Sequence, residues 1–216
     1  MFCFMQGVML SKYARQSTEN TFEKTRHIAR IGMIAAVYAA FTLITILFLG
    51  SLAWGPIQFR ISEALTVLAL FTFDAVPGLT LGCVIANVAN MALSGTGALG
   101  LFDVVFGSLA TCVGAYITWK MRKRPLLALL GPVLANAIIV PAYLPILLKG
   151  IGFYTIPFTD IDLETSYMLM YLFGLFTTGL GEAVVLYILG FPLVRALKKT
   201  PLPASLEEPE GMQISV

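Results

Sequence analysis

The sequence predicts an all-α integral membrane protein with six transmembrane helices, and three observations carry this prediction. Apolar residues make up 58% of the 216 residues and charged residues only 12%, which is about half the charged share of a soluble domain. The apolar residues form runs long enough to cross a hydrocarbon layer of about 30 Å. These runs are apolar nearly all round, which indicates that lipid surrounds most of the chain.

The apolar runs between charged and turn-forming residues define six expected spans. They lie at 28–49, 57–73, 76–93, 101–119, 125–148 and 167–193. The second is the weakest, because its purely apolar part is short enough to be tilted or re-entrant, although we still expect a helix. We expect a six-helix domain at 28–199, a cytoplasmic lead-in at 1–27 and a cytoplasmic tail at 200–216.

Basic residues orient this bundle. They gather before the first span, in the loop at 120–124 and after the sixth span, and only Arg60 and Lys149 of the 14 lie elsewhere. The positive-inside rule therefore predicts that the N and C termini and the 120–124 loop are cytoplasmic. The polar loops around 94–97 and 160–164 then face outside, where they serve either as lids or as simple connectors.

Several polar side chains lie inside the expected spans, where a charge costs roughly 3 kcal/mol or more on insertion scales. They are Gln58, Arg60, Glu63, Asn87, Asn90, Asp103, Asn136 and Glu182. At about 1.5 Å per helical residue, Glu63, Asn87, Asn136 and Glu182 fall near the membrane midplane. Arg60, Asn90 and Asp103 fall nearer the outer surface, so the sequence predicts a polar pocket that opens outward.

These residues have two interpretations. They pair with one another, as Arg60 and Glu63 can at i and i+3 on one helix, or they bind a ligand. One arginine cannot neutralise Glu63, Asp103 and Glu182 together, and the asparagines add donors and acceptors without charge. A neutral or cationic ligand rich in hydrogen-bond donors fits this set best.

Motifs for catalysis are missing from the sequence. The single histidine, His27, cannot form a two-histidine zinc site, and neither a nucleophile motif nor a glycine-rich phosphate-binding loop occurs. We therefore expect a binding or transport protein rather than an enzyme, with no cofactor, metal or nucleic acid. Any ATP hydrolysis must come from another chain.

Small residues form a ladder in the first span. Small residues four apart let another helix approach closely in lipid. The ladder is Gly32, Ala36 and Ala40, with Ala35 and Ala39 alongside. It serves either packing within the bundle or docking of a partner.

Several stretches in order resemble one family. They are QFRISEAL at 58–65, PGL at 77–79, GC at 82–83, AN at 86–87, DVVFGSLAT at 103–111 and GLGE at 179–182. Across about 28–199 the chain resembles the queuosine-precursor transporter (QueT) family, which are substrate-binding S components of energy-coupling factor (ECF) transporters. The resemblance implies an S-component-like bundle in a prokaryotic plasma membrane. Such a protein captures a 7-deazaguanine base, such as preQ0, preQ1 or queuine, from outside.

The resemblance also implies protein partners. S components dock on a transmembrane coupling subunit, the T component, which is driven by two ATPase subunits. The ladder of Gly32, Ala36 and Ala40 is similar to the alanine motif used for that docking. The alternatives are an S component or carrier for another small metabolite and, less favoured, a membrane-embedded enzyme.

A guanine-like ligand suits the expected pocket. Its ring N–H and exocyclic amine form a donor pair that one carboxylate accepts. Glu182 is the first candidate for that carboxylate and Glu63 the second. The candidates for the ligand's carbonyl and remaining edges are Asn87, Asn90 and Asn136, and Phe59 or Trp54 at the outer mouth would stack on the ring.

Overall fold

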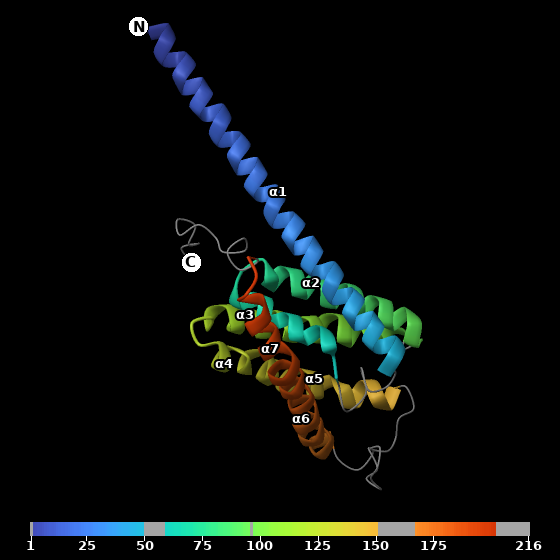
Figure 1. Ribbon diagram of the computed structural model, residues 1–216. Coiled ribbons are helices and arrows are strands. Elements are labelled where there is room, and N and C mark those ends of the chain that lie inside the picture. Colours follow the sequence, from blue (N-terminus) through green and yellow to red (C-terminus); the bar gives the residue numbers. More distant parts are fainter. Residues whose placement is uncertain (1, 50–58, 96, 151–166, 202–216) are drawn as a thin grey trace.

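The computed structural model describes residues 2–49, 59–95, 97–150 and 167–201, and every regular element among them is a helix. Five helical stretches are long and apolar enough to cross a membrane (Figure 1). They are Thr21–Leu49, Ala75–Ser94, Gly97–Lys120, Pro125–Ile146 and Tyr167–Leu197. The predicted all-α membrane architecture is confirmed for this part of the chain.

The expected second span differs from a full transmembrane helix. Its described part forms the 3-10 helix η2, Ile61–Leu70, of 10 residues. At about 2.0 Å per residue this helix is roughly 20 Å long, which is shorter than the hydrocarbon layer. Seven of its residues are buried, including Ser62, Glu63 and Thr66. Neighbouring helices cover most of η2, so its length does not have to match the membrane.

The helix α1, Phe2–Leu49, contains 48 residues and is therefore roughly 72 Å long. Figure 1 shows its N-terminal part projecting well beyond the bundle. The lead-in expected before residue 28 is thus one continuous helix with the first span from Phe2 onward. Within the bundle, α1 packs along α2, Ala75–Ser94.

Glycine allows α1 and α2 to approach closely. A Cβ placed on Gly82 would lie 2.7 Å from the Ala35 carbonyl oxygen and 2.8 Å from the Tyr38 Cβ. Gly78, one turn earlier, is also close to α1, since a Cβ placed on it would lie 2.9 Å from the Ile34 Cβ. Close packing of this kind stabilises helix pairs in lipid.

The helical stretch Gly97–Lys120, which contains the fourth expected span, is built from three pieces. A short 3-10 helix η3, Gly97–Gly100, precedes the π-helical turn η4, Asp103–Gly107, which continues into α3, Ser108–Lys120. The connection to the fifth span contains α4, Pro125–Ala128, whose proline stands in the first turn. The helix α5, Leu130–Gly150, then packs between α3 and α6.

The last span also changes its helical geometry. It runs from α6, Tyr167–Val184, through the π-helical η5, Val185–Gly190, into α7, Phe191–Leu197. The η5 turn packs against η2, and Val67 lies 3.0 Å from a Cβ placed on Gly190. The last span therefore supports the short helix that carries Arg60 and Glu63 at its beginning.

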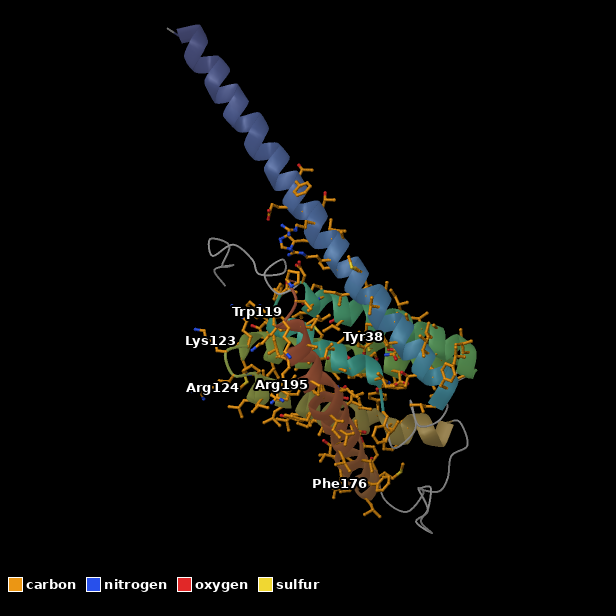
Figure 2. The ribbon with its side chains drawn as sticks, viewed as in Figure 1. Tyr38, Trp119, Lys123, Arg124, Phe176 and Arg195 are labelled. Carbon is orange, nitrogen blue, oxygen red and sulfur yellow. The ribbon has the colours of Figure 1, made fainter. Side chains whose placement is uncertain are left out.

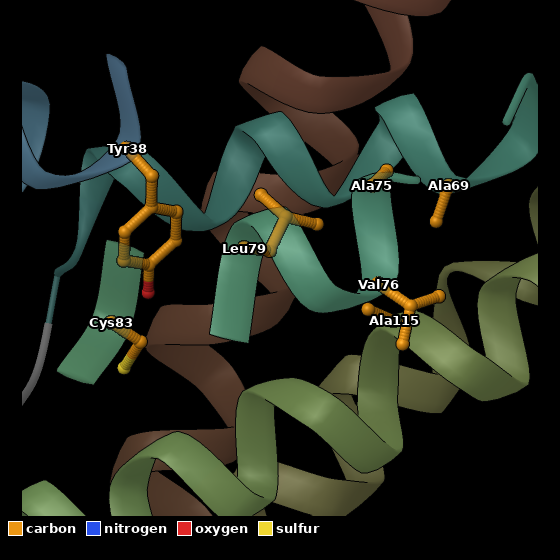
Figure 3. Close-up of a cluster of buried hydrophobic side chains, with 7 residues drawn as sticks. All are labelled: Tyr38, Ala69, Ala75, Val76, Leu79, Cys83 and Ala115. Carbon is orange, nitrogen blue, oxygen red and sulfur yellow. The ribbon is translucent and has the colours of Figure 1, made fainter. Parts of the chain in front are cut away.

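The core joins α1, η2, α2 and α3 through small and medium side chains (Figure 3). Figure 3 shows Tyr38 and Cys83 at one end of this cluster and Ala69, Val76 and Ala115 at the other. The polar interior begins at the Tyr38 end, because Tyr38 and Cys83 both contact polar side chains there.

Basic side chains gather at one end of the bundle. Figure 2 shows Lys123, Arg124 and Arg195 at the end where α3 meets α4. Arg122 stacks over the Trp119 ring at 4.8 Å, and Arg195 over the ring of Phe191 at 4.7 Å. That this end is cytoplasmic remains a prediction of the positive-inside rule.

Candidate ligand-binding site

Seven of the predicted pocket residues lie in the bundle interior, each exposing no more than 7% of its surface. They extend from the start of η2 through α2, η4, α5 and α6 and are Arg60, Glu63, Asn87, Asn90, Asp103, Asn136 and Glu182. Phe59 is half-buried at the start of this region. Trp54 and Gln58 lie outside the described residues. The helices therefore bring the predicted polar residues into one buried region.

Glu63 has hydrogen-bond donors on both carboxylate oxygens. The Tyr38 hydroxyl donates to Oε1, and the Thr111 hydroxyl lies 3.2 Å from the same atom. The Thr66 hydroxyl lies 3.3 Å from Oε2. Neutral hydroxyl groups from α1, η2 and α3 thus hold this carboxylate in place and occupy its lone pairs.

Asp103 and Asn87 form a second polar group. The Asn87 Nδ2 donates to the backbone oxygen of Asp103 at 2.8 Å, and the Tyr143 hydroxyl donates to Asp103 Oδ1 at 2.7 Å. Phe102 and Phe106 stack beside the Tyr143 ring with centroids 6.2 and 5.8 Å away. The π-helical turn η4 and the preceding Phe102 therefore place a carboxylate and two aromatic rings beside Tyr143 of α5.

Arg60 is 7% exposed and lies within electrostatic range of Asp103 and Tyr143. Gly107 makes room for this group. A Cβ there would lie 3.2 Å from Asn87 Nδ2, 3.3 Å from the Tyr143 hydroxyl and 3.9 Å from Arg60 Nη1. A larger residue at 107 would push these polar groups apart.

Five buried side-chain atoms have no hydrogen-bond partner in the described part of the chain. They are Asn90 Oδ1, Ser108 Oγ, Asn136 Nδ2, Thr178 Oγ1 and Glu182 Oε1. An unsatisfied buried polar atom typically costs about 1–3 kcal/mol. Folding brings these five atoms into the interior at that cost, which a ligand with matching donors and acceptors would remove.

Glu182 is the charged member of this unsatisfied set. It lies beside Asn136 and within electrostatic range of Glu63 and Arg60. The Asn136 side chain is close to it, yet Asn136 Nδ2 reaches no acceptor with hydrogen-bonding geometry. A carboxylate with a free oxygen and an amide with a free N–H therefore stand side by side.

Two members of the set, Ser108 and Thr178, are absent from the sequence-based prediction. Hydroxyl residues in helices commonly bond back to their own helix, as Thr177 does to the Phe173 carbonyl at 2.9 Å. Nothing in the residue types distinguishes Thr178 from Thr177. Only the folded structure distinguishes them, because Thr178 Oγ1 has no partner in the described residues.

The small-residue ladder divides into two faces. Ala35 and Ala39 are buried, 1% and 7% exposed, and Ala35 packs against Gly82 of α2. Gly32, Ala36 and Ala40 lie on the exposed face of α1. Packing within the bundle therefore uses Ala35 and Ala39, whereas the other three residues remain available to another helix.

Comparisons with known proteins agree with the resemblance noted in the sequence. The model of the QueT transporter family matches residues 28–199. The "Queuosine precursor transporter QueT" of Lactococcus lactis subsp. cremoris (strain MG1363) is 38% identical over 90 residues, which cover 42% of this chain and 47% of that protein. The matched region thus spans about half the length of that relative. No solved structure matches the chain.

Proposed function

The chain belongs to the QueT transporter family, and from this premise we propose that it is the substrate-binding S component of an ECF importer for queuosine precursors. It is a multi-pass membrane protein, and its family is one of transporters rather than enzymes. The proposed ligand is a 7-deazaguanine base that enters from outside. The observation that carries this proposal is the set of five buried polar atoms without a hydrogen-bond partner in the described residues, which includes Glu182 Oε1.

These atoms complement a guanine-like ring. Glu182 Oε1 and Asn90 Oδ1 are acceptors for ring N–H and amine groups, and Asn136 Nδ2 is a donor for the ring carbonyl. The hydroxyls of Ser108 and Thr178 serve as donor or acceptor. A flat ligand with several N–H donors and one carbonyl satisfies the set, whereas an apolar ligand leaves every atom unpaired.

The geometry favours Glu182 over Glu63 as the ligand's carboxylate. Glu63 already accepts from Tyr38, Thr66 and Thr111, whereas Glu182 retains a free oxygen. In this proposal Glu63 does not contact the ligand and affects binding only through its charge. In this proposal Arg60, Asn87 and Asp103 shape the wall, and Phe59 lies at the pocket's edge.

Coupling to ATP requires other chains. The exposed face of Gly32, Ala36 and Ala40 is the proposed contact with the T component, because small side chains permit close helix approach. Two ATPase subunits bound to that component supply the hydrolysis. Ala35 and Ala39 support this face from inside the bundle.

Binding to the purified protein tests the proposal. Glu182→Gln keeps the shape but removes one acceptor, so affinity for 7-deazaguanine bases should fall roughly tenfold to a hundredfold. Glu63→Gln is the matched control, and it should lower the thermal stability more than the affinity because Glu63 binds hydroxyls of the protein. A folded Glu182→Gln protein with the parent affinity would show that Glu182 does not bind the ligand.

A further inference from the structure

Exposed basic side chains gather on two stretches of the chain at the same end of the bundle. The first stretch connects α3 to α4 and contributes Lys120, Arg122, Lys123 and Arg124, all exposed. The second begins in the last turn of α7 and contributes Arg195, Lys198 and Lys199, also exposed. Figure 2 shows Lys123, Arg124 and Arg195 at this end. These residues together form what we call the cationic face.

Packing beneath the cationic face holds the two stretches next to each other. Ala128 and Leu129, at the end of α4, share one hydrophobic cluster with Val194 of α7. The Tyr187 hydroxyl of η5 donates to the Leu126 carbonyl oxygen of α4 at 2.8 Å. The fold therefore fixes α4 against η5 and α7, and with them the two groups of basic side chains.

The helices that carry the cationic face offer no exposed carboxylate to balance it. In 97–150 and 167–201 the only acidic residues are Asp103 and Glu182, and each is 5% exposed. Like charges that crowd on one surface repel one another and create a positive potential there. An anion from outside these helices is therefore favoured at this surface.

Aromatic and apolar neighbours indicate which kind of anion fits. The Arg122 guanidinium lies 4.8 Å from the Trp119 ring centre, and that of Arg195 lies 4.7 Å from the Phe191 ring centre. Aromatic rings at helix ends are typical of the level of lipid headgroups, and stacking orders a guanidinium before it binds phosphate. Leu126 and Leu127, directly after the first stretch, are 55% and 43% exposed. A water-soluble anion would contact only the cations, whereas a lipid contacts both.

We propose that the cationic face binds the phosphate headgroup of an acidic phospholipid in the leaflet at this end of the bundle. The guanidinium groups of Arg122 and Arg195 donate to phosphate oxygens, and the lysines add positive charge around them. The acyl chains lie along the exposed leucines of α4. This lipid site is separate from the polar pocket, and it stands whether or not the pocket binds a 7-deazaguanine base.

Trp119 provides the reporter for the test, because Trp54→Phe leaves it as the only tryptophan of the full-length protein. The protein would be reconstituted in phosphatidylcholine vesicles that contain either brominated phosphatidylglycerol or phosphatidylcholine with the same brominated chains. Quenching of the Trp119 fluorescence then measures which lipid lies beside it. The apparent affinity should be at least about threefold higher for phosphatidylglycerol. Equal affinities for the two lipids would overturn the proposal.

Salt separates recognition of the headgroup charge from recognition of the chains. Raising NaCl from about 0.1 M to 1 M shortens the screening length from about 10 Å to 3 Å, so most of the preference for phosphatidylglycerol should disappear. A preference that is the same at both salt concentrations would contradict binding through the cationic face.

Two variants that each remove one positive charge locate the site. Arg195→Gln should reduce the preference at least about twofold, and it leaves Trp119 and its stacked Arg122 in place. Lys149→Gln removes the same charge near the far end of α5 and should leave the preference unchanged. Equal reductions in both variants would show an effect of net charge and overturn the site. An unchanged lipid preference with lost uptake in Arg195→Gln would overturn it as well, and would assign the face to an acidic protein partner.

Discussion

At the residue scale, Tyr38 joins the packing of α1 to the polar interior. Its ring is fully buried in the core beside Leu79 and Cys83, and its hydroxyl donates to Glu63. The position of that hydroxyl depends on how closely α1 approaches α2. Gly82, which sits against Ala35 and Tyr38, and Gly78, which sits against Ile34, allow this close approach because neither has a side chain.

The first residue-scale prediction is that Gly82→Ala destabilises the protein by about 1–3 kcal/mol. The new methyl group would meet the Ala35 carbonyl oxygen at 2.7 Å and the Tyr38 Cβ at 2.8 Å, so the two helices must separate. Thermal unfolding in detergent would measure the effect. Gly32→Ala is the control, because nothing lies within 4 Å of its Cβ and alanine favours a helix by up to about 1 kcal/mol. Equal melting temperatures for both variants would contradict this reading of the α1–α2 contact.

At the element scale, three helices next to the site depart from α-helical geometry. They are the 3-10 helix η2 and the π-helical turns η4 and η5. π-Helical turns occur frequently at functional sites because they redirect side chains. Here η4 places Asp103 opposite Tyr143 of α5, and η5 follows Glu182 by three residues and packs on η2.

The sequence could predict the five long spans but not these departures. Long apolar runs require a helix in lipid, because every backbone group must be bonded internally. A π-helical turn at 103–107 has no such signature, since residues like Val104 and Val105 also fit an α-helix. The same contrast holds in the site, where Glu182 and Asn136 were predictable from the cost of burying them. Ser108 and Thr178 were not predictable, because only the folded structure shows that their hydroxyl groups have no hydrogen-bond partner in the described residues.

The element-scale prediction concerns the exposed face of α1. Ala36→Leu should abolish uptake while leaving ligand affinity within about twofold of the parent, because the side chain points away from the interior and would block close helix approach. Uptake in cells and binding to purified protein would separate the two steps. Ala92→Leu, an exposed position on α2, is the control and should preserve both. Loss of binding in a folded Ala36→Leu protein would assign this face to internal packing.

At the scale of the whole molecule, basic side chains gather at one end of the bundle. The end that carries Lys123, Arg124 and Arg195 is basic (Figure 2). At the start of α2, the buried Asp74 side chain binds His27 and Arg30 of α1. These contacts tie α1 to α2 on the side from which the N-terminal part of α1 projects (Figure 1). We propose that this basic end is the cytoplasmic face, as the positive-inside rule predicts.

The final prediction tests this orientation with single cysteines. Lys123→Cys and Ala98→Cys, introduced after replacing Cys3, Cys83 and Cys112, should react with a membrane-impermeant maleimide from opposite sides. Positions 123 and 98 are both exposed and lie at opposite ends of the stretch that runs from η3 through α3. In intact cells only the cysteine at 98 should be labelled, and after permeabilisation both should be, because basic loops remain in the cytoplasm. Labelling at 123 in intact cells would show the opposite orientation in the membrane. The proposed coupling to cytoplasmic ATPase subunits would then be wrong.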